Sequence, residues 1–204
     1  MATKFRPITH IISNNTIRPL SIFEVVPDPP APTIPVVLMP DGNYWTSVDL
    51  DIDDGQGGVS IFNNVTVNGY NFGTQYYYTH EAAMRIASNL QGYHLPTIQE
   101  VTTLMNSIGG ESYDISLKLR NTYGWDNYQG TDDYGFSVLP VGNKFYTSDR
   151  IEWTGMYTRY WLYDDKPVED EYTRFNNLSI EYNGINIGDE ISTFGYKVRL
   201  VKDN

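Results

Sequence analysis

Proline is concentrated at the start of this chain, and its distribution limits what the chain can fold into more than any other feature does. Eight of the 11 prolines fall within the first 40 of 204 residues. Proline fixes φ, lacks a backbone N–H donor and biases the preceding residue to extended geometry. The run Val-Pro-Asp-Pro-Pro-Ala-Pro at 26–32 is typical of a stiff polyproline-like spacer. We therefore expect residues 1–40 to form an extended Pro-rich arm.

This arm is too apolar to be a solvated tail, since aliphatic and aromatic residues recur along it. Two interpretations stay open. The arm is either an extended strand packed on its own domain, or an anchor that becomes buried against another subunit or a larger assembly. In the second case the candidate assembly contacts are Ile11, Ile12, Ile17, Leu20 and Phe23.

The rest of the chain divides into a β-rich segment and a larger region with helices. Turn dipeptides such as Asp41-Gly42 and Asn68-Gly69 separate short apolar alternations over 41–69, which predicts a small β segment. Thr79 can cap a first helix whose apolar stripe runs from Ala82 to Leu90, with Gly92 as its end.

A second helix is predicted by the capping box Thr-Ile-Gln-Glu at 97–100, with a stop at Gly109-Gly110. A third, shorter helix is expected over 115–120. After Tyr123 the pattern favours short aromatic strands and turns.

Charge and composition exclude several classes of partner. Fourteen Lys and Arg against 25 Asp and Glu give a net charge of −11, with no basic cluster. Nucleic acid and anionic membrane surfaces are therefore not expected as partners. No apolar run approaches the roughly 20 residues of a membrane-spanning helix. Cysteine is absent, which removes disulfides, thiolate metal sites and cysteine nucleophiles.

The remaining residues offer little catalytic chemistry, so we expect neither an enzyme nor a cofactor. His10, His80 and His94 lie in separate segments, and no Gly-x-Ser-x-Gly elbow is present. Calcium is the one metal with a sequence argument, because an alternating acidic run precedes Gly55, at Asp49, Asp51, Asp53 and Asp54. The run lacks the Glu that closes an EF-hand loop, and a solvated acidic turn is the alternative.

A partner-binding surface is better supported, in the loop-like region 153–167. Aromatic and Arg side chains supply contact area at low entropic cost, and sugars stack on such rings. The candidate ligand-binding residues, for a host surface glycan or protein, are Tyr157, Arg159, Tyr160, Trp161 and Asp164. We expect Tyr157, Tyr160 and Asp164 to be the more exposed; the alternative is that half of these rings belong to the core.

Six sequence blocks occur in a fixed order over about residues 70–204. They are Tyr-Thr-His-Glu-Ala-Ala at 78–83, Gly-Tyr-His-Leu-Pro-Thr at 92–97, Leu-Lys-Leu-Arg-Asn-Thr-Tyr-Gly-Trp at 117–125, Thr-Asp-Asp-Tyr-Gly-Phe at 131–136, Glu-Trp-Thr at 152–154 with Arg-Tyr-Trp at 159–161, and Gly-Tyr-Lys-Val-Arg at 195–199. Together they resemble the Fibrobacter succinogenes major paralogous domain family, whose members are similar to C-type-lectin-like and formylglycine-generating-enzyme-like proteins. The resemblance implies an α+β, C-type-lectin-like domain over 70–204, with two main helices and short antiparallel strands.

The residues of the fourth block have structural explanations. Asp132 and Asp133 can accept backbone N–H bonds in a turn, and Gly135 supplies a positive φ. Phe136, Val138 and Leu139 are expected in the core. The absence of cysteine excludes the copper chemistry of formylglycine-generating enzymes.

Two departures from the family bear on function. Members are commonly exported lipoproteins with a cysteine pair, whereas this chain has Leu200 in the terminal strand and Ser-Asn-Leu-Gln at 88–91, and residues 1–7 lack the apolar core of a secretory signal. Both departures favour folding in the cytoplasm. We expect a non-enzymatic structural and adhesion protein of a virus particle, such as a phage head fibre, decoration or tail-associated protein.

In that interpretation the arm binds other virion proteins, the lectin-like domain faces outward, and the protein is a homo-oligomer. The alternative is a bacterial surface or secreted carbohydrate-binding module.

Overall fold

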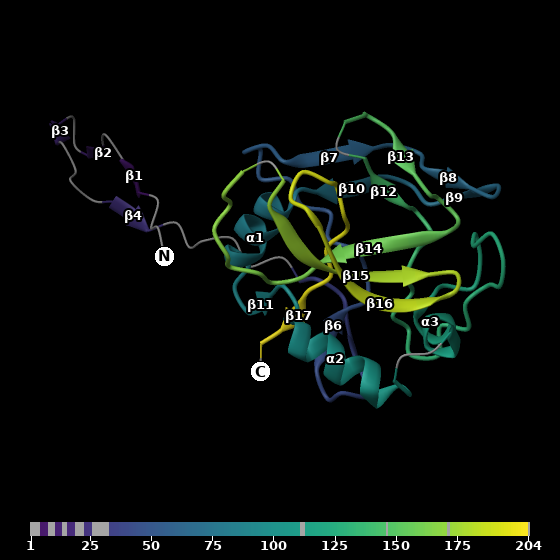
Figure 1. The fold of residues 1–204 in the computed structure, drawn as a ribbon. Helices are drawn as coiled ribbons and strands as arrows, with labels where there is room; N and C mark the ends of the chain where they lie inside the picture. Colours follow the sequence, from purple (N-terminus) through teal and green to yellow (C-terminus); the bar gives the residue numbers. More distant parts are fainter. Residues whose placement is uncertain are drawn as a thin grey trace. The chain divides into compact units, whose positions relative to one another are not determined.

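The chain forms two compact units, Met1–Thr33 and Ile34–Asn204. The computed structural model describes residues 5–7, 11–13, 16–18, 23–25, 33–110, 113–145, 147–170 and 172–203. The second unit, here called the C-terminal unit, is mixed α+β, with small antiparallel sheets and three helices in its described part (Figure 1). The predicted α+β class is confirmed. The predicted spacer at 26–32 lies outside the described residues.

The first unit, here called the N-terminal unit, contains two nested antiparallel strand pairs. Strand β1 (Phe5–Pro7) pairs with β4 (Phe23–Val25), and β2 (Ile11–Ser13) pairs with β3 (Thr16–Arg18). In the inner pair Ile12 lies opposite Ile17. Of the candidate assembly contacts, Leu20 lies outside the described residues, and the other four lie on these strands.

A four-stranded sheet joins the start and the end of the C-terminal unit. Its order is β11 (Tyr93–His94), β17 (Val201–Lys202), β6 (Tyr44–Thr46) and β5 (Val36–Leu38). Residues 36–38 thus pair within this unit, which starts before residue 40. The consequence is that the last strand is held between segments far from it in sequence.

The C-terminal unit also contains three smaller antiparallel strand pairs. They are β7 (Val59–Phe62) with β10 (Gln75–Tyr78), β8 (Thr66–Val67) with β9 (Tyr70–Asn71), and β12 (Asn143–Lys144) with β13 (Ile151–Glu152). Asn68 and Gly69 join β8 to β9, and both have positive φ, at 50° and 82°. This dipeptide therefore forms the tight hairpin turn that its sequence predicts.

The three helices follow the sequence signals closely. Helix α1 spans His80–Ser88 with Thr79 as its N-cap, α2 spans Ile98–Ser107 with a complete capping box, and α3 spans Tyr113–Leu119. Helix α1 ends before the predicted stop at Gly92. The Asn89 side chain donates to the Arg85 carbonyl at 2.9 Å, which satisfies a terminal carbonyl and ends the helix early.

A three-stranded sheet separates two hydrophobic cores. It consists of β14 (Tyr157–Trp161), β15 (Arg174–Glu181) and β16 (Gly184–Ile191), the last two being longer than the short strands predicted. Because side chains alternate along a strand, Tyr160 enters the core with α2 and α3, while Trp161 enters the core with α1. In Figure 1 this sheet lies in the middle of the unit. We call these two clusters the α2 core and the α1 core.

The capping box of α2 gives a direct test of these helix signals. Thr97 Oγ1 accepts the Glu100 N–H at 3.2 Å, and Glu100 Oε2 accepts the Thr97 N–H at 2.8 Å. We expect Thr97→Ala to lower the free energy of unfolding by about 1–2 kcal/mol in urea denaturation, because the Glu100 N–H loses its acceptor. The control, Thr103→Ala at an exposed position of the same helix, should stay within about 0.5 kcal/mol of the parent. Equal effects of the two changes would contradict this role of the cap.

Candidate functional site

The closing segment 195–202 carries two cations into the interior. Tyr196, Val198 and Leu200 belong to the α1 core, and alternation places Lys197 and Arg199 on the other side. Both are buried, with exposed fractions of 1% and 2%. Burying a charge without a partner is costly, so these cations require acceptors within the fold.

Arg199 connects three segments that are distant in sequence. Its Nε donates to Asp49 Oδ1 at 2.6 Å, and its Nη1 donates to the carbonyls of Thr46 and Phe136, each at 2.8 Å. The guanidinium also lies 4.9 Å from the centre of the Phe136 ring. One side chain thereby holds the end of β6 and the 131–139 loop against the closing segment.

The loop that Arg199 contacts has the geometry that its sequence predicts. Asp132 Oδ1 accepts the Ser137 N–H at 2.7 Å, and Gly135 has a φ of 70°. Phe136 and Val138 are fully buried in the α2 core, and Leu139 is half-buried. The structural interpretation of this block is confirmed for these residues.

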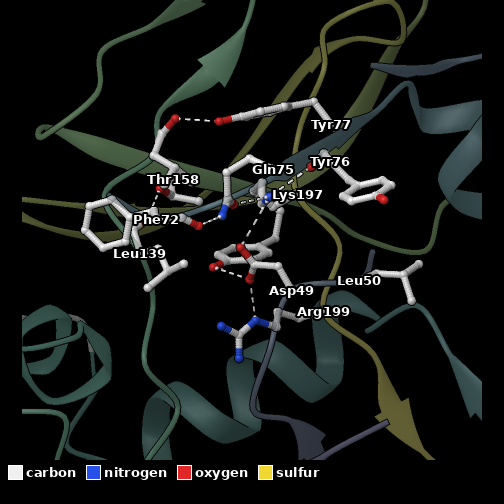
Figure 2. Close-up of polar contacts among 12 residues, drawn as sticks. Asp49, Leu50, Phe72, Gln75, Tyr76, Tyr77, Leu139, Thr158, Lys197 and Arg199 are labelled. Carbon is white, nitrogen blue, oxygen red and sulfur yellow. Dashed lines mark hydrogen bonds and ion pairs between the residues drawn. The ribbon is translucent and has the colours of Figure 1, made fainter. Parts of the chain in front are cut away.

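Asp49 is the anion that balances the buried cations. Its side chain is 7% exposed and lies between Lys197 and Arg199 in Figure 2. Its Oδ1 also accepts the Tyr160 hydroxyl at 3.1 Å. Burial acts to raise the pKa of Asp49, but the charges of Arg199 and Lys197 and the hydrogen bonds outweigh it, so the pKa is lowered. Asp49 is therefore ionised at neutral pH.

Lys197 extends the cluster toward β10. Its Nζ donates to Gln75 Oε1 at 2.8 Å and to the Tyr76 carbonyl at 2.9 Å, and it lies 3.6 Å from Asp49 Oδ2. Burial lowers the pKa of Lys197 to about 8, against the opposing charge of Asp49. The group is mainly an ammonium at neutral pH.

A pocket of about 180 Å³ borders this cluster. Its lining is mixed, with apolar side chains from Val48, Leu50, Tyr76 and Leu139, and polar ones from Asp49, Asp51, Thr74, Gln75 and Lys197. Figure 2 shows Leu139 and Leu50 on opposite sides of the Asp49–Lys197 pair. We take the buried cluster and this pocket as the candidate functional site.

The pairing of Asp49 with Lys197 and Arg199 was not predicted from the sequence, although one signal of it was present. In the closing segment, Lys197 and Arg199 alternate with apolar residues, and the rest of this segment has the apolar pattern of a buried strand. A buried strand with two cations needs an acidic partner elsewhere, but spacing cannot tell which carboxylate supplies it.

The predicted ligand-binding residues do not form one site. Tyr157 and Arg159 are half-buried neighbours, with the Arg159 guanidinium 4.9 Å from the Tyr157 ring centre. Tyr160 and Trp161 are 1% and 0% exposed, so the expectation that Tyr160 is exposed is wrong. Each fills one of the two cores, because β14 is covered on both faces.

Asp164 lies beyond the other end of β14 from Tyr157. It lines a separate pocket of about 280 Å³ with His80, Lys166 and Phe175. Its Oδ2 binds Lys166 Nζ at 3.0 Å and the Asn176 side chain at 2.7 Å. The aromatic pair at Tyr157 and the carboxylate of Asp164 are thus parts of different surfaces.

The acidic run considered for calcium is dispersed in the fold. Asp49 is bound by Arg199, and Asp54 is bound by Arg85 at 2.7 Å. Asp53 accepts the N–H of Gly55 in its own turn, and Asp51 is exposed. Within the described ranges, no group of three or more His, Asp or Glu side chains is arranged to hold a metal ion.

His94 forms a second charged cluster, at the surface. Its Nδ1 lies 2.6 Å from Asp203 Oδ1, and its Nε2 lies 2.8 Å from Glu100 Oε1. Partial burial acts to lower the pKa of His94, but the hydrogen bonds and charges of Glu100 and Asp203 outweigh it and raise the pKa. When it is protonated, the ring connects α2 to the residue that follows β17 through both carboxylates.

Comparison with known proteins identifies no relative of this chain. No model of a known protein family matches it, and no curated protein or solved structure matches it significantly. No helix in the described part of the chain is long and apolar enough to cross a membrane.

The buried ion pair predicts a large loss of stability on removal of its cation. Arg199→Met should lower the free energy of unfolding by about 3–5 kcal/mol, because Asp49 keeps its charge and loses its main partner. The control is Arg174→Met, at a residue that is 51% exposed and bound to Asp189, and it should cost about 1 kcal/mol or less.

Chemical denaturation of Arg199→Met, of Asp49→Asn and of the double variant that carries both changes measures the coupling between the two residues. We expect the double variant to cost less than the two single costs combined, by about 1–3 kcal/mol. Additive costs, or an Arg199→Met cost no larger than that of Arg174→Met, would contradict the role of the pair.

The His94 cluster predicts a pH-dependent contribution to stability. Because the folded pKa is raised, the contribution is fully present below the unfolded value of 6.5 and is lost as pH rises through the folded pKa. The stability difference between the parent and His94→Gln should therefore be larger at pH 6 than at pH 9, by about 1 kcal/mol or less, since solvent screens this pair. Taking the difference removes the effect of Lys197, which titrates near pH 8. A difference that is constant with pH would contradict the prediction.

Proposed function

We propose that this chain is a non-enzymatic structural and adhesion protein. Its N-terminal unit anchors it to a larger assembly, such as a phage particle in which it serves as a head fibre, decoration or tail-associated protein. Its C-terminal unit displays a binding surface. We further propose that the chain is a homo-oligomer assembled through the N-terminal unit.

The observation that carries this proposal is the separate N-terminal unit. Its described strands form two-stranded ladders within residues 1–33. A two-stranded ladder has no second layer against which to bury apolar side chains, and chains below about 40 residues usually need disulfides, metals or oligomerisation to fold. The segment has no cysteine but has a high content of Ile, Leu, Val and Phe. A partner surface would supply the missing layer.

The surface around Trp153 supports a binding role for the C-terminal unit. Trp153 is 36% exposed and has a φ of 58°, a strained conformation for a bulky residue. Its ring stacks on Tyr157 at 5.3 Å between centres, and Arg159 lies on the Tyr157 ring. Two of the predicted ligand-binding residues, Tyr157 and Arg159, belong to this aromatic stack.

The partners of the buried titratable groups support a non-enzymatic role. Arg199 and Lys197 bind backbone carbonyls, Asp49 and an amide. Hydrogen bonds of buried cations to fixed backbone and side-chain acceptors are typical of groups that hold a fold together. His80 is similarly placed, with its Nε2 3.2 Å from the Leu162 carbonyl and burial lowering its pKa to about 4.

A C-type-lectin-like fold of the Fibrobacter succinogenes family type is our proposal for the architecture of the C-terminal unit. It rests on the six ordered blocks and on the α+β class with α1 and α2 as its longest helices. A bacterial surface or secreted carbohydrate-binding module is the second candidate. The exposed stack of Trp153 on Tyr157 favours it, since sugars pack on such rings.

Truncation tests the anchoring role. In light scattering coupled to size exclusion, the full chain should be oligomeric and residues 34–204 monomeric. The thermal midpoint of residues 34–204 should be retained, because the C-terminal unit has its own cores. Ile12→Thr with Ile17→Thr should dissociate the full chain while keeping β-branched residues in the ladder. Ser13→Thr, at the next position of the same strand, is the matched control, because it replaces no apolar residue, and it should leave the oligomer intact.

A monomeric full chain would contradict the oligomer. A truncated chain with a much lower midpoint would show instead that the arm packs on its own domain. A monomeric full chain that binds glycans on an array would favour the second candidate.

A further inference from the structure

The pocket beside Asp49 contains a buried acceptor that the fold leaves unused. Asp49 Oδ2 is fully buried and accepts no hydrogen bond within the described residues. The nearest cation, Lys197 Nζ, is 3.6 Å away, which is beyond hydrogen-bond distance. A buried, unsatisfied carboxylate oxygen is costly, so a donor from outside the chain would be stabilised here.

Lys197 also retains bonding capacity on the same side of the pocket. An ammonium has three donors, and two of them bind Gln75 Oε1 and the Tyr76 carbonyl. The third makes no hydrogen bond within the described residues, and the ion pair of Nζ with Asp49 Oδ2 at 3.6 Å leaves a distance that an intervening hydrogen-bonding group would bridge. A single group that both donates to Asp49 and accepts from Lys197 therefore fits this position, and a hydroxyl has both capacities.

The charges and the walls of the pocket narrow the ligand class further. The lining has two carboxylates, of Asp49 and Asp51, and one ammonium, of Lys197. Arg199 does not line the pocket but neutralises Asp49 from behind it, so the local charges balance and favour a neutral ligand. Val48, Leu139 and the ring of Tyr76 offer apolar surface to C–H groups. The volume of about 180 Å³ is several times the roughly 30 Å³ of one liquid water.

We infer that this pocket binds a small neutral polyhydroxyl group, with one hydroxyl bridging Asp49 Oδ2 and Lys197 Nζ. The ligand is either a free polyol or the exposed end of a larger saccharide, since both present the same hydroxyls. The inference concerns a different surface from the aromatic stack at Trp153. It is independent of the anchoring role of the N-terminal unit.

The test has to spare the ion network, because Asp49→Asn would disturb the contacts that hold the fold. Val48 is 44% exposed and lines the pocket, so Val48→Trp would fill the pocket without replacing any charged side chain. Val168→Trp is the matched control, since Val168 is 60% exposed and is absent from this lining. The thermal midpoints of both variants verify that they fold.

The probes are glycerol, erythritol and methyl α-glucopyranoside, with acetate and ethylammonium as charged controls. Polyols stabilise proteins by exclusion from their surface, so a shift in thermal midpoint is not sufficient evidence of binding. NMR titration of the Lys197 Nζ resonance and the Leu139 methyl groups in the full chain reports on the pocket directly.

We expect saturable shifts of both groups with a dissociation constant on the order of 1–10 mM, since so small a ligand gains limited binding free energy. Val48→Trp should weaken binding at least tenfold, and Val168→Trp should leave it unchanged. Response to glycerol and erythritol alone would assign a free polyol, and response to the glycoside would assign a saccharide end. Shifts that stay linear, that are equal in Val48→Trp, or that are absent for all neutral probes would overturn the inference and leave a pocket filled by water.

Discussion

The ion pair of Arg199 with Asp49 is the interaction on which the C-terminal unit depends. It joins three segments, the closing segment, the chain after β6 and the 131–139 loop, none of which neighbours another in sequence. Buried ion pairs add little net stability over apolar packing, but they make any other arrangement of the same segments costly. A fold of many short strands has few long ladders to define it. The buried charges therefore select one arrangement of segments that apolar contacts alone would leave open.

The buried cluster of Asp49, Lys197 and Arg199 both stabilises the fold and borders the pocket of the candidate site. Arg199 binds Oδ1 of Asp49, whereas Oδ2 accepts no hydrogen bond among the described residues. Lys197 binds residues of strand β10, and both Asp49 and Lys197 line the pocket. The aromatic stack of Trp153, Tyr157 and Arg159 lies on the three-stranded sheet instead, and Asp164 belongs to a third surface. The unit thus has separate surfaces of different chemistry on one scaffold.

Local features were predictable because their causes are local. Thr97 and Glu100 bind each other's backbone within one helical turn, and Asn68-Gly69 forms its turn by its own φ preference. The Asp132 turn and the burial of Phe136 followed from the same kind of reasoning. The expected exposure of Tyr160 was wrong, because aromatic residues serve surface and core equally well; Tyr160 and its neighbour Trp161 are both buried. Their burial depends on β14 being covered on both faces, which involves α1, α2 and α3 together.

The sequence by itself determined the α+β class, the positions of the three helices, the cysteine-free chemistry and the acidic balance, since each depends on composition or on contacts a few residues apart. Only the tertiary structure decided which carboxylate binds Arg199, which oxygen of Asp49 accepts no hydrogen bond among the described residues, and which predicted ligand-binding residues share a surface. Asp49 and Arg199 are 150 positions apart, as their hydrogen bond shows. Electrostatic pairing depends on distance in space, and that distance exists only after the sheets and helices have packed.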